Sequence, residues 1–180
     1  MREFLKGSVG KMIEIIKDRL LIIPCSLDIA KSLIFHRKEL ETRSPIGIPC
    51  AWPSSAVRGM LPLFIEKLEK NDQEHGLGLW LIILYNEKRI IGDLFLQGMP
   101  DDSGTVELSY NIHEAADEES LTYEAIDAVM EWLTSERKVA SIQMECLDEN
   151  SKSIKLFEKL GMICTKKEDV FLSWELKKKA

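Results

Sequence analysis

The stretch GTVELSYNIHEAADEESLTYEAIDAVMEWLTSERKVASIQMECLDENSKSIKLFEKLGM, residues 104–162, decides the fold of this chain. Residues 104–112 alternate apolar and polar side chains, which is typical of a strand with one buried face. A helical pattern runs to about residue 137 and is followed by a β-rich segment at 139–147 and a second helix at 149–162. Such a unit holds anionic ligands at the connection after its first strand. We therefore expect any chemical function at that connection.

The composition predicts a single globular domain. Of the 180 residues, 45% are hydrophobic and 30% are charged, which suits neither a disordered chain nor a membrane bundle. We expect the domain to span residues 12–180, after an N-terminal extension at residues 1–11 in which no periodicity persists. No apolar run has the length of a bilayer span, and the first residues lack the pattern of a secretory signal. The expected location is therefore the cytoplasm, with no membrane partner.

The charge and the cysteines argue against two classes of ligand. A net charge of −6 disfavours nucleic acid, because that affinity depends on clustered Lys and Arg. The four cysteines are widely spaced, with no CxxC motif and no His at zinc-ligand spacing. We expect reduced structural thiols and no metal site. Nothing in the sequence decides the oligomeric state, and a homodimer is left open.

Three positions in the first half of the chain have more than one interpretation. His36 falls on the apolar stripe of a helix that Ser26 is placed to cap, so a hydrogen-bonded structural histidine is favoured over a catalytic one. Trp52 lies in a proline-rich loop at residues 44–53, either as a lid over a pocket or as a plug for the core. Pro62 is expected to kink or divide the helical segment that follows.

The order of the elements predicts an α/β fold with a mixed sheet. Strands at residues 80–86, 90–98 and 106–112 should form an antiparallel meander. The helix that follows is long enough to cross over, which makes the strand at 139–147 parallel to the third of these strands. With further strands near the N-terminus and a final hairpin at 163–176, we expect about six or seven strands, mostly antiparallel, with a central parallel pair and helices on both faces.

The strand at residues 106–112 presents a row of polar side chains. Glu107, Ser109 and Asn111 alternate with apolar residues and so place a carboxylate, a hydroxyl and an amide on one face. This row could take a proton from an amine, or it could be an ordinary solvated face of a sheet. The spacing alone favours the solvated face.

Three motifs of the chain resemble one known family. They are DRLLIIPCSLDIAKSL at 18–33, GTVELSYNI at 104–112 and ENSKSIKLFEKLGM at 149–162, of which the last is the most specific. They are similar to motifs of the GNAT superfamily of N-acetyltransferases, in particular the branch that includes the ribosomal-protein N-terminal acetyltransferases. The resemblance extends from Arg19 to Leu176. It implies a transferase with an acetyl-coenzyme A site between the two central parallel strands, which splay apart.

The resemblance also implies roles for individual residues. The family reaction is direct attack of an amine on the thioester, and Glu107 matches the position of the base, with Ser109 beside it. The amine acceptor, a small molecule or a peptide N-terminus, would lie near His36, Trp52 and Asn111. The implied cofactor contacts are Ile112, Asp117, Glu118, Glu119, Ser120, Leu121, Thr122, Asn150, Ser153 and Phe157. In many members a tyrosine at the position of Phe157 protonates the leaving thiolate, and phenylalanine cannot.

The phosphate loop departs from the family pattern. The branch's version, Arg-Gly-x-Gly-x-Ala, falls on residues 117–122, where both glycines and the basic residue are missing. Acidic residues crowd the place of the phosphates, namely Glu114, Asp117, Glu118 and Glu119. At a helix N-terminus each carboxylate gains about 0.3–1 kcal/mol from the dipole, so the protein could fill its own anion site. The alternative function is therefore a GNAT-fold binding or interaction module with weak or no coenzyme A binding.

Overall fold

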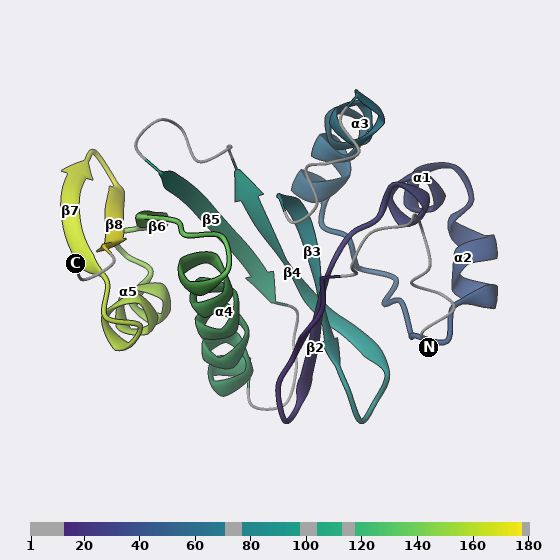
Figure 1. Cartoon of the computed structure of the whole chain (residues 1–180), viewed down its shortest axis with the longest axis horizontal. Helices are drawn as coiled ribbons and strands as arrows, with labels where there is room; N and C mark the ends of the chain where they lie inside the picture. The colour runs from purple at the N-terminus through teal and green to yellow at the C-terminus, as the bar shows by residue number, and fades with distance from the viewer. Residues whose placement is uncertain (1–12, 71–76, 98–103, 113–117, 178–180) are drawn as a thin grey trace.

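One sheet of eight strands runs through the molecule, in the order β1-β2-β3-β4-β5-β6-β8-β7 (Figure 1). The computed structural model describes residues 13–70, 77–97, 104–112 and 118–177. In these ranges the strands are β1 (Ile15–Ile16), β2 (Leu20–Pro24), β3 (Gly78–Leu84), β4 (Arg89–Gln97), β5 (Thr105–Ile112), β6 (Ser141–Leu147), β7 (Ile163–Glu168) and β8 (Phe171–Lys177). The helices are α1 (Leu27–Phe35), α2 (Arg37–Arg43), α3 (Ser55–Lys70), α4 (Glu118–Ser135) and α5 (Ser151–Lys159).

The strands from β1 to β5 form an antiparallel meander, which confirms the order expected for residues 80–112. Within it, Gly92 of β4 pairs with Ile112 of β5, and Asp93 pairs with Asn111. A glycine is needed at position 92, because a Cβ there would lie 2.4 Å from the carbonyl oxygen of Asn111. This close approach fixes β4 against the part of β5 that borders the site.

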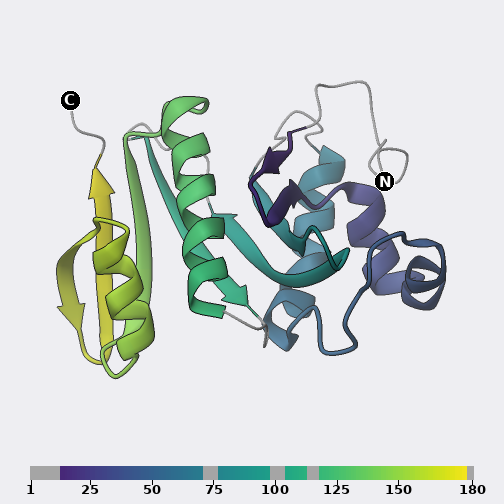
Figure 2. The same cartoon turned by 90° about the horizontal axis from the view of Figure 1, so that it is seen from below.

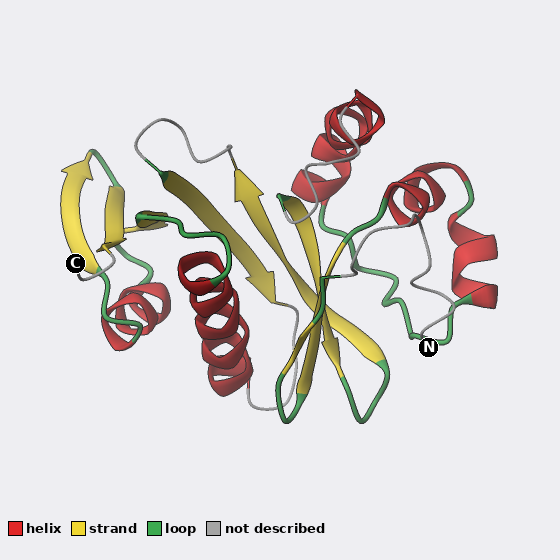
Figure 3. Ribbon diagram, viewed as in Figure 1, coloured by secondary structure: helices red, strands yellow, loops and turns green. Residues whose placement is uncertain are grey.

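Helices cover the two faces of the sheet unequally (Figures 2 and 3). On one face, α4 packs over the centre of the sheet and α5 over its C-terminal end, and the two helices share a core with residues of β2 to β6 and β8. On the other face, α1, α2 and α3 pack over β2, β3 and β4, and this second core includes no residue of β5 or β6. The polar residues Glu107 and Ser109 of β5 are therefore exposed on an uncovered part of the sheet.

The strands β5 and β6 form the parallel pair that the sequence predicts. They are paired only at their beginnings, from Thr105 opposite Ser141 to Glu107 opposite Gln143. Beyond these positions β5 continues to Ile112 and β6 continues to Leu147 without pairing to each other. The two strands thus splay apart beyond these pairs (Figure 1).

Two details of the helices and one of the sheet differ from the sequence predictions. Pro62 lies inside α3, which is a single helix. The proline is exposed, so water can satisfy the carbonyl that loses its partner, while Leu61 and Phe64 on either side are buried. The apolar stripe through His36 is interrupted, because α1 ends at Phe35, α2 begins at Arg37 and His36 lies between the two helices. The sheet also has one strand more than expected.

Candidate active site

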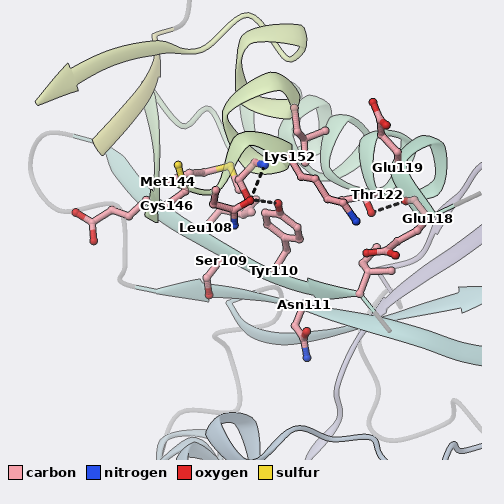
Figure 4. A pocket seen from close by; sticks show the side chains of 15 residues that line it. Leu108, Ser109, Tyr110, Asn111, Glu118, Glu119, Thr122, Met144, Cys146 and Lys152 are labelled. Carbon is pink, nitrogen blue, oxygen red and sulfur yellow. Dashed lines mark hydrogen bonds between the residues drawn. The ribbon is translucent and has the colours of Figure 1, made fainter. Parts of the chain in front are cut away.

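A cleft opens where β5 and β6 part, with a volume of about 410 Å³ (Figure 4). Its walls come from β5, the start of α4, the second half of β6 and the start of α5. One wall is the stretch of β5 from Leu108 to Ile112, whose edge toward β6 is not used for strand pairing. Unpaired strand edges offer backbone N–H and C=O groups to an extended ligand. The cleft therefore has the shape and the bonding groups for an elongated molecule.

The start of α5 forms a hydrogen-bonded cluster with β5. Asn150 caps the helix, its side-chain oxygen accepting the backbone N–H of Ser153 at 3.1 Å. The buried Ser153 hydroxyl lies 2.9 Å from the phenol oxygen of Tyr110, which Figure 4 marks with a dashed line. The Tyr110 ring stands edge-on to Phe157. Burial raises the pKa of Tyr110, an effect that the Ser153 hydrogen bond opposes. The phenol is therefore neutral at pH 7 and is able to donate a proton.

The start of α4 brings acidic side chains to the same cleft. Glu118 and Glu119 line it and are exposed, and within the described part of the chain their carboxylates form no hydrogen bond or ion pair. The hydroxyl of Thr122 donates to the carbonyl oxygen of Glu118 at 2.6 Å. The predicted filling of the anion site by acidic side chains is thus not seen for these two residues. Asp117 and Glu114 lie outside the described residues.

One lysine side chain also lines the cleft. Lys152, the second residue of α5, lines the cleft opposite the acidic helix start, and its side chain extends toward Glu118 and Thr122 (Figure 4). It makes no ion pair with the described residues. A flexible ammonium group of this kind suits a phosphate that the backbone alone does not neutralise. The end of the cleft nearest α4 therefore carries charges of both signs.

Most of the expected site residues come together in this cleft. Those that line it are Ser109, Asn111, Ile112, Glu118, Glu119, Thr122, Asn150 and Ser153. The lining does not include Glu107, Ser120, Leu121 or Phe157. Glu107 lies where β5 is still paired with β6, and Ser120 accepts a hydrogen bond from Arg19 at 2.8 Å. Leu121 and Phe157 are core residues with exposed fractions of 2% and 0%.

The two acceptor-site candidates from the first half of the chain lie elsewhere. His36 is exposed at the junction of α1 and α2, toward the opposite end of the sheet from α5 (Figure 1). Trp52 has no exposed surface, so of its two expected roles the structure shows the core plug. Its indole N–H donates to Oδ2 of Asp93 at 2.7 Å. Asp93 is only 2% exposed, and this burial raises its pKa to about 6 against the opposing effect of the Trp52 hydrogen bond.

Seven lining residues were not expected from the sequence, and three of them, Tyr110, Glu145 and Lys152, bear on the chemistry of the site. Tyr110 is one of the residues that alternate with the polar row of its strand, and the splaying of β6 turns part of that core face into a wall of the cleft. Glu145 on β6 and Lys152 on α5 carry no local signal, because each is an ordinary exposed polar residue of its element.

The fold and the matching motifs decide the family. Residues 19–163 match the model of the acetyltransferase (GNAT) domain. The chain belongs to the GNAT acetyltransferase family. Members of this family transfer an acyl group from acyl-coenzyme A, so the predicted enzyme class is confirmed at this level.

Individual GNAT proteins are similar to the chain over most of its length. The "Uncharacterized N-acetyltransferase YjdG" of Bacillus subtilis (strain 168) is 29% identical over 123 residues, which cover 68% of this chain and 73% of that protein. A putative ribosomal-protein-serine acetyltransferase from Vibrio cholerae has a TM-score of 0.63 at 14% identity, covering 92% of this chain and 98% of that one. Apo FdhC, a nucleotide-linked sugar GNAT, has a TM-score of 0.67 at 12% identity, covering 93% and 91%.

Within the described residues, no group of three or more His, Cys, Asp or Glu side chains is arranged to hold a metal ion. None of the described helices is both long and apolar enough to cross a bilayer.

Proposed function

We propose that this GNAT protein is an N-acetyltransferase that moves an acetyl group from acetyl-coenzyme A to a primary amine of a small molecule or a peptide N-terminus. The cleft between β5 and β6 carries the proposal. Its volume of about 410 Å³ lies in the range of small-molecule sites, and the free edge of β5 can pair with the amides of the pantetheine arm. Leu108, Met144 and Leu156 supply apolar contacts for the same arm.

The charges of the cleft suggest which way the cofactor lies. The phosphates of coenzyme A must stay hydrated or meet cations, so they belong at the open end beside the start of α4 and Lys152. The uncharged arm then runs along β5 toward the point where the strands begin to pair. Lys152 fits this placement, whereas Glu118 and Glu119 oppose it by like-charge repulsion. The residues that line the cleft therefore suit the pantetheine arm better than they suit the phosphates.

The reaction needs a base for the amine, and the uncovered face of the sheet carries two carboxylates for it. Glu107 is the position that the family resemblance implies, next to the Ser109 hydroxyl. Glu145 lines the cleft itself, where its Oε1 accepts a hydrogen bond from Ser173 at 3.1 Å. Replacing each with glutamine separates them, because a base removed in this way lowers turnover about 10²-fold or more without a matching loss of cofactor affinity.

Binding of acetyl-coenzyme A is the first test. A ligand at a hundred times its dissociation constant stabilises the folded state by about 2.7 kcal/mol. For a domain of this size that corresponds to a rise of roughly 5–11 °C in Tm. We expect such a rise with millimolar acetyl-coenzyme A. If no rise appears in thermal unfolding and no heat in calorimetry, the alternative function as a binding or interaction module without coenzyme A takes its place.

The two glutamates at the start of α4, Glu118 and Glu119, favour this alternative, because they line the cleft without a partner among the described residues. A double variant, Glu118→Gln with Glu119→Gln, should tighten acetyl-coenzyme A binding by removing two like charges, most clearly at low salt. Glu136→Gln, at the other end of α4, is the matched control. Lys152→Ala should weaken acetyl-coenzyme A while leaving S-acetyl-pantetheine unchanged. Equal effects on both ligands would contradict the proposed position of the phosphates.

The acceptor class is tested with two kinds of amine. The similar structures include a ribosomal-protein-serine acetyltransferase and a nucleotide-linked sugar GNAT, so both a peptide amine and an amino sugar are reasonable acceptors. A panel of peptides with a free N-terminus and of nucleotide-linked amino sugars, assayed by release of the coenzyme A thiol, distinguishes them. Release with neither class would remove both from the proposal.

A further inference from the structure

We propose that Tyr110 is the proton donor to the leaving thiolate, an inference that rests on the proposed acetyl transfer. Expulsion of coenzyme A from the thioester generates a thiolate, and a neutral acid at the sulfur assists that step. Tyr110 is the tyrosine that lines the cleft among the described residues. The family's usual position for this acid, Phe157, has no hydroxyl and is fully buried.

The geometry holds the Tyr110 hydroxyl at one place in the cleft. Its oxygen lies 2.9 Å from Ser153 Oγ, and Ser153 is itself fixed by the Asn150 cap of α5. The ring is held from the other side by Phe157, at 6.3 Å between ring centroids and 77° between planes. Phe157 in turn stands edge-on to Trp174 at 5.8 Å. Phe157, which has no hydroxyl at the family's usual acid position, thus supports the ring of Tyr110, which has one.

The position of Tyr110 along β5 agrees with the path of the cofactor. It lies between Ile112, next to the charged end of the cleft, and Glu107, where the strands are still paired. An arm that enters from the charged end and follows the β5 edge must carry its thioester past the middle of this wall. Burial keeps the phenol protonated at neutral pH, as a donor requires.

In the proposed step, the amine nitrogen attacks the thioester carbon, the C–N bond forms and the C–S bond breaks. The sulfur takes the phenolic proton of Tyr110, and the proton that the amine loses passes to a carboxylate of the open face. The phenolate recovers a proton from water by way of the Ser153 hydroxyl, and the carboxylic acid gives its proton to the hydroxide that this leaves. Both residues and the water are thereby restored, and the amide and the free thiol are the products.

The test needs no acceptor amine. The thiolate absorbance of bound coenzyme A is titrated from neutral into alkaline pH until it reaches its plateau, with the curve of the free protein subtracted. The subtraction removes the protein's own thiols, including Cys146, whose pKa burial raises. The charged groups that share the cleft with Tyr110 are Glu118 and Glu119 from α4, Glu145 from β6 and Lys152 from α5, and they are unchanged by the substitution.

We expect the bound thiol to titrate about one unit higher in Tyr110→Phe than in the wild type, because the thiolate loses a hydrogen-bond donor. The dissociation constant for coenzyme A at pH 7 should change less than threefold. Tyr123→Phe is the matched control, since Tyr123 lies on α4 under the ammonium of Lys159 and outside the cleft. It should leave the thiol titration unchanged.

The outcomes separate this inference from the proposed function. If coenzyme A binds and its thiol titrates alike in the wild type and Tyr110→Phe, the assignment of Tyr110 is wrong and the acetyltransferase proposal stands. The absence of coenzyme A binding to the wild type overturns both. A shift of the thiol pKa in Tyr110→Phe, with binding retained and the control unchanged, supports the assignment.

Discussion

The buried carboxylate of Asp93 predicts an unusual dependence of stability on pH. Asp93 is 2% exposed and is bonded to the indole of the equally buried Trp52. Replacing it with asparagine removes the ionisable group, keeps the shape of the side chain and leaves an oxygen to accept the Trp52 N–H. We expect the folded wild type to lose stability relative to Asp93→Asn as the pH rises from about 4 to 7.

The sign and the size follow from the pKa. Burial raises the pKa of Asp93 from the ordinary 3.8 to about 6, so the folded state holds its proton more tightly than the unfolded state. The stability that this proton provides is complete below the unfolded pKa and is lost as the pH rises through the folded pKa. At about 1.4 kcal/mol per unit the total is about 3 kcal/mol, of which roughly 2 kcal/mol fall between pH 4 and pH 7.

Urea unfolding of both proteins at a series of pH values measures the difference directly. Other carboxylates titrate in the same range, so the informative quantity is the wild-type free energy of unfolding minus that of Asp93→Asn. Asp127→Asn, at an exposed position of α4, provides the control for exchanging a surface carboxyl for an amide. A flat difference for Asp93→Asn would show that its carboxyl has a nearly ordinary pKa and that our account of its burial is wrong.

Three further substitutions test the fold. Gly92→Ala should lower the free energy of unfolding in urea by about 1–3 kcal/mol, because its Cβ would lie 2.4 Å from the carbonyl oxygen of Asn111. Gly47→Ala is the control and should change it little, because the nearest atom to its Cβ would be 3.6 Å away. Ser26→Ala removes the α1 cap bond of 3.3 Å and should cost about 1 kcal/mol, measured as a lower Tm; an unchanged Tm would mean that the cap is dispensable. Arg19→Ala removes two hydrogen bonds of 2.8 Å to Glu124 and Ser120 of α4 and should lower the free energy of unfolding in chemical denaturation by about 1 kcal/mol. Lys17→Ala should lower it less, because it loses one exposed ion pair.

The strand order and the parallel pair could be predicted from the sequence because their signals are local. Period-two alternation marks residues 106–112, and the long helix after them requires a parallel return. Ser26 was recognisable as a helix cap for the same reason, since its side chain bonds a backbone amide only three residues away.

The parts that could not be predicted depend on contacts between residues that are distant in the sequence. Trp52 could be a lid or a plug until the buried Asp93 on β4 was found to accept its N–H. Tyr110 has the alternation of a core residue, and only the unpairing of β6, set by tertiary packing, places it in a cleft. Pro62 shows the opposite case, in which buried neighbours keep a helix continuous against a local preference.

The short parallel ladder also has a consequence for the cooperativity of unfolding. Residues 141–177, which form β6, α5, β7 and β8, bond mainly among themselves and join the sheet through the pairs Thr105–Ser141 to Glu107–Gln143. Such a contiguous segment is able to open as a unit at lower free energy than the meander. A ligand that bonds both edges of the cleft would act as a missing strand between them. Amide exchange in residues 141–177 would then slow on binding, far beyond the residues that the ligand touches.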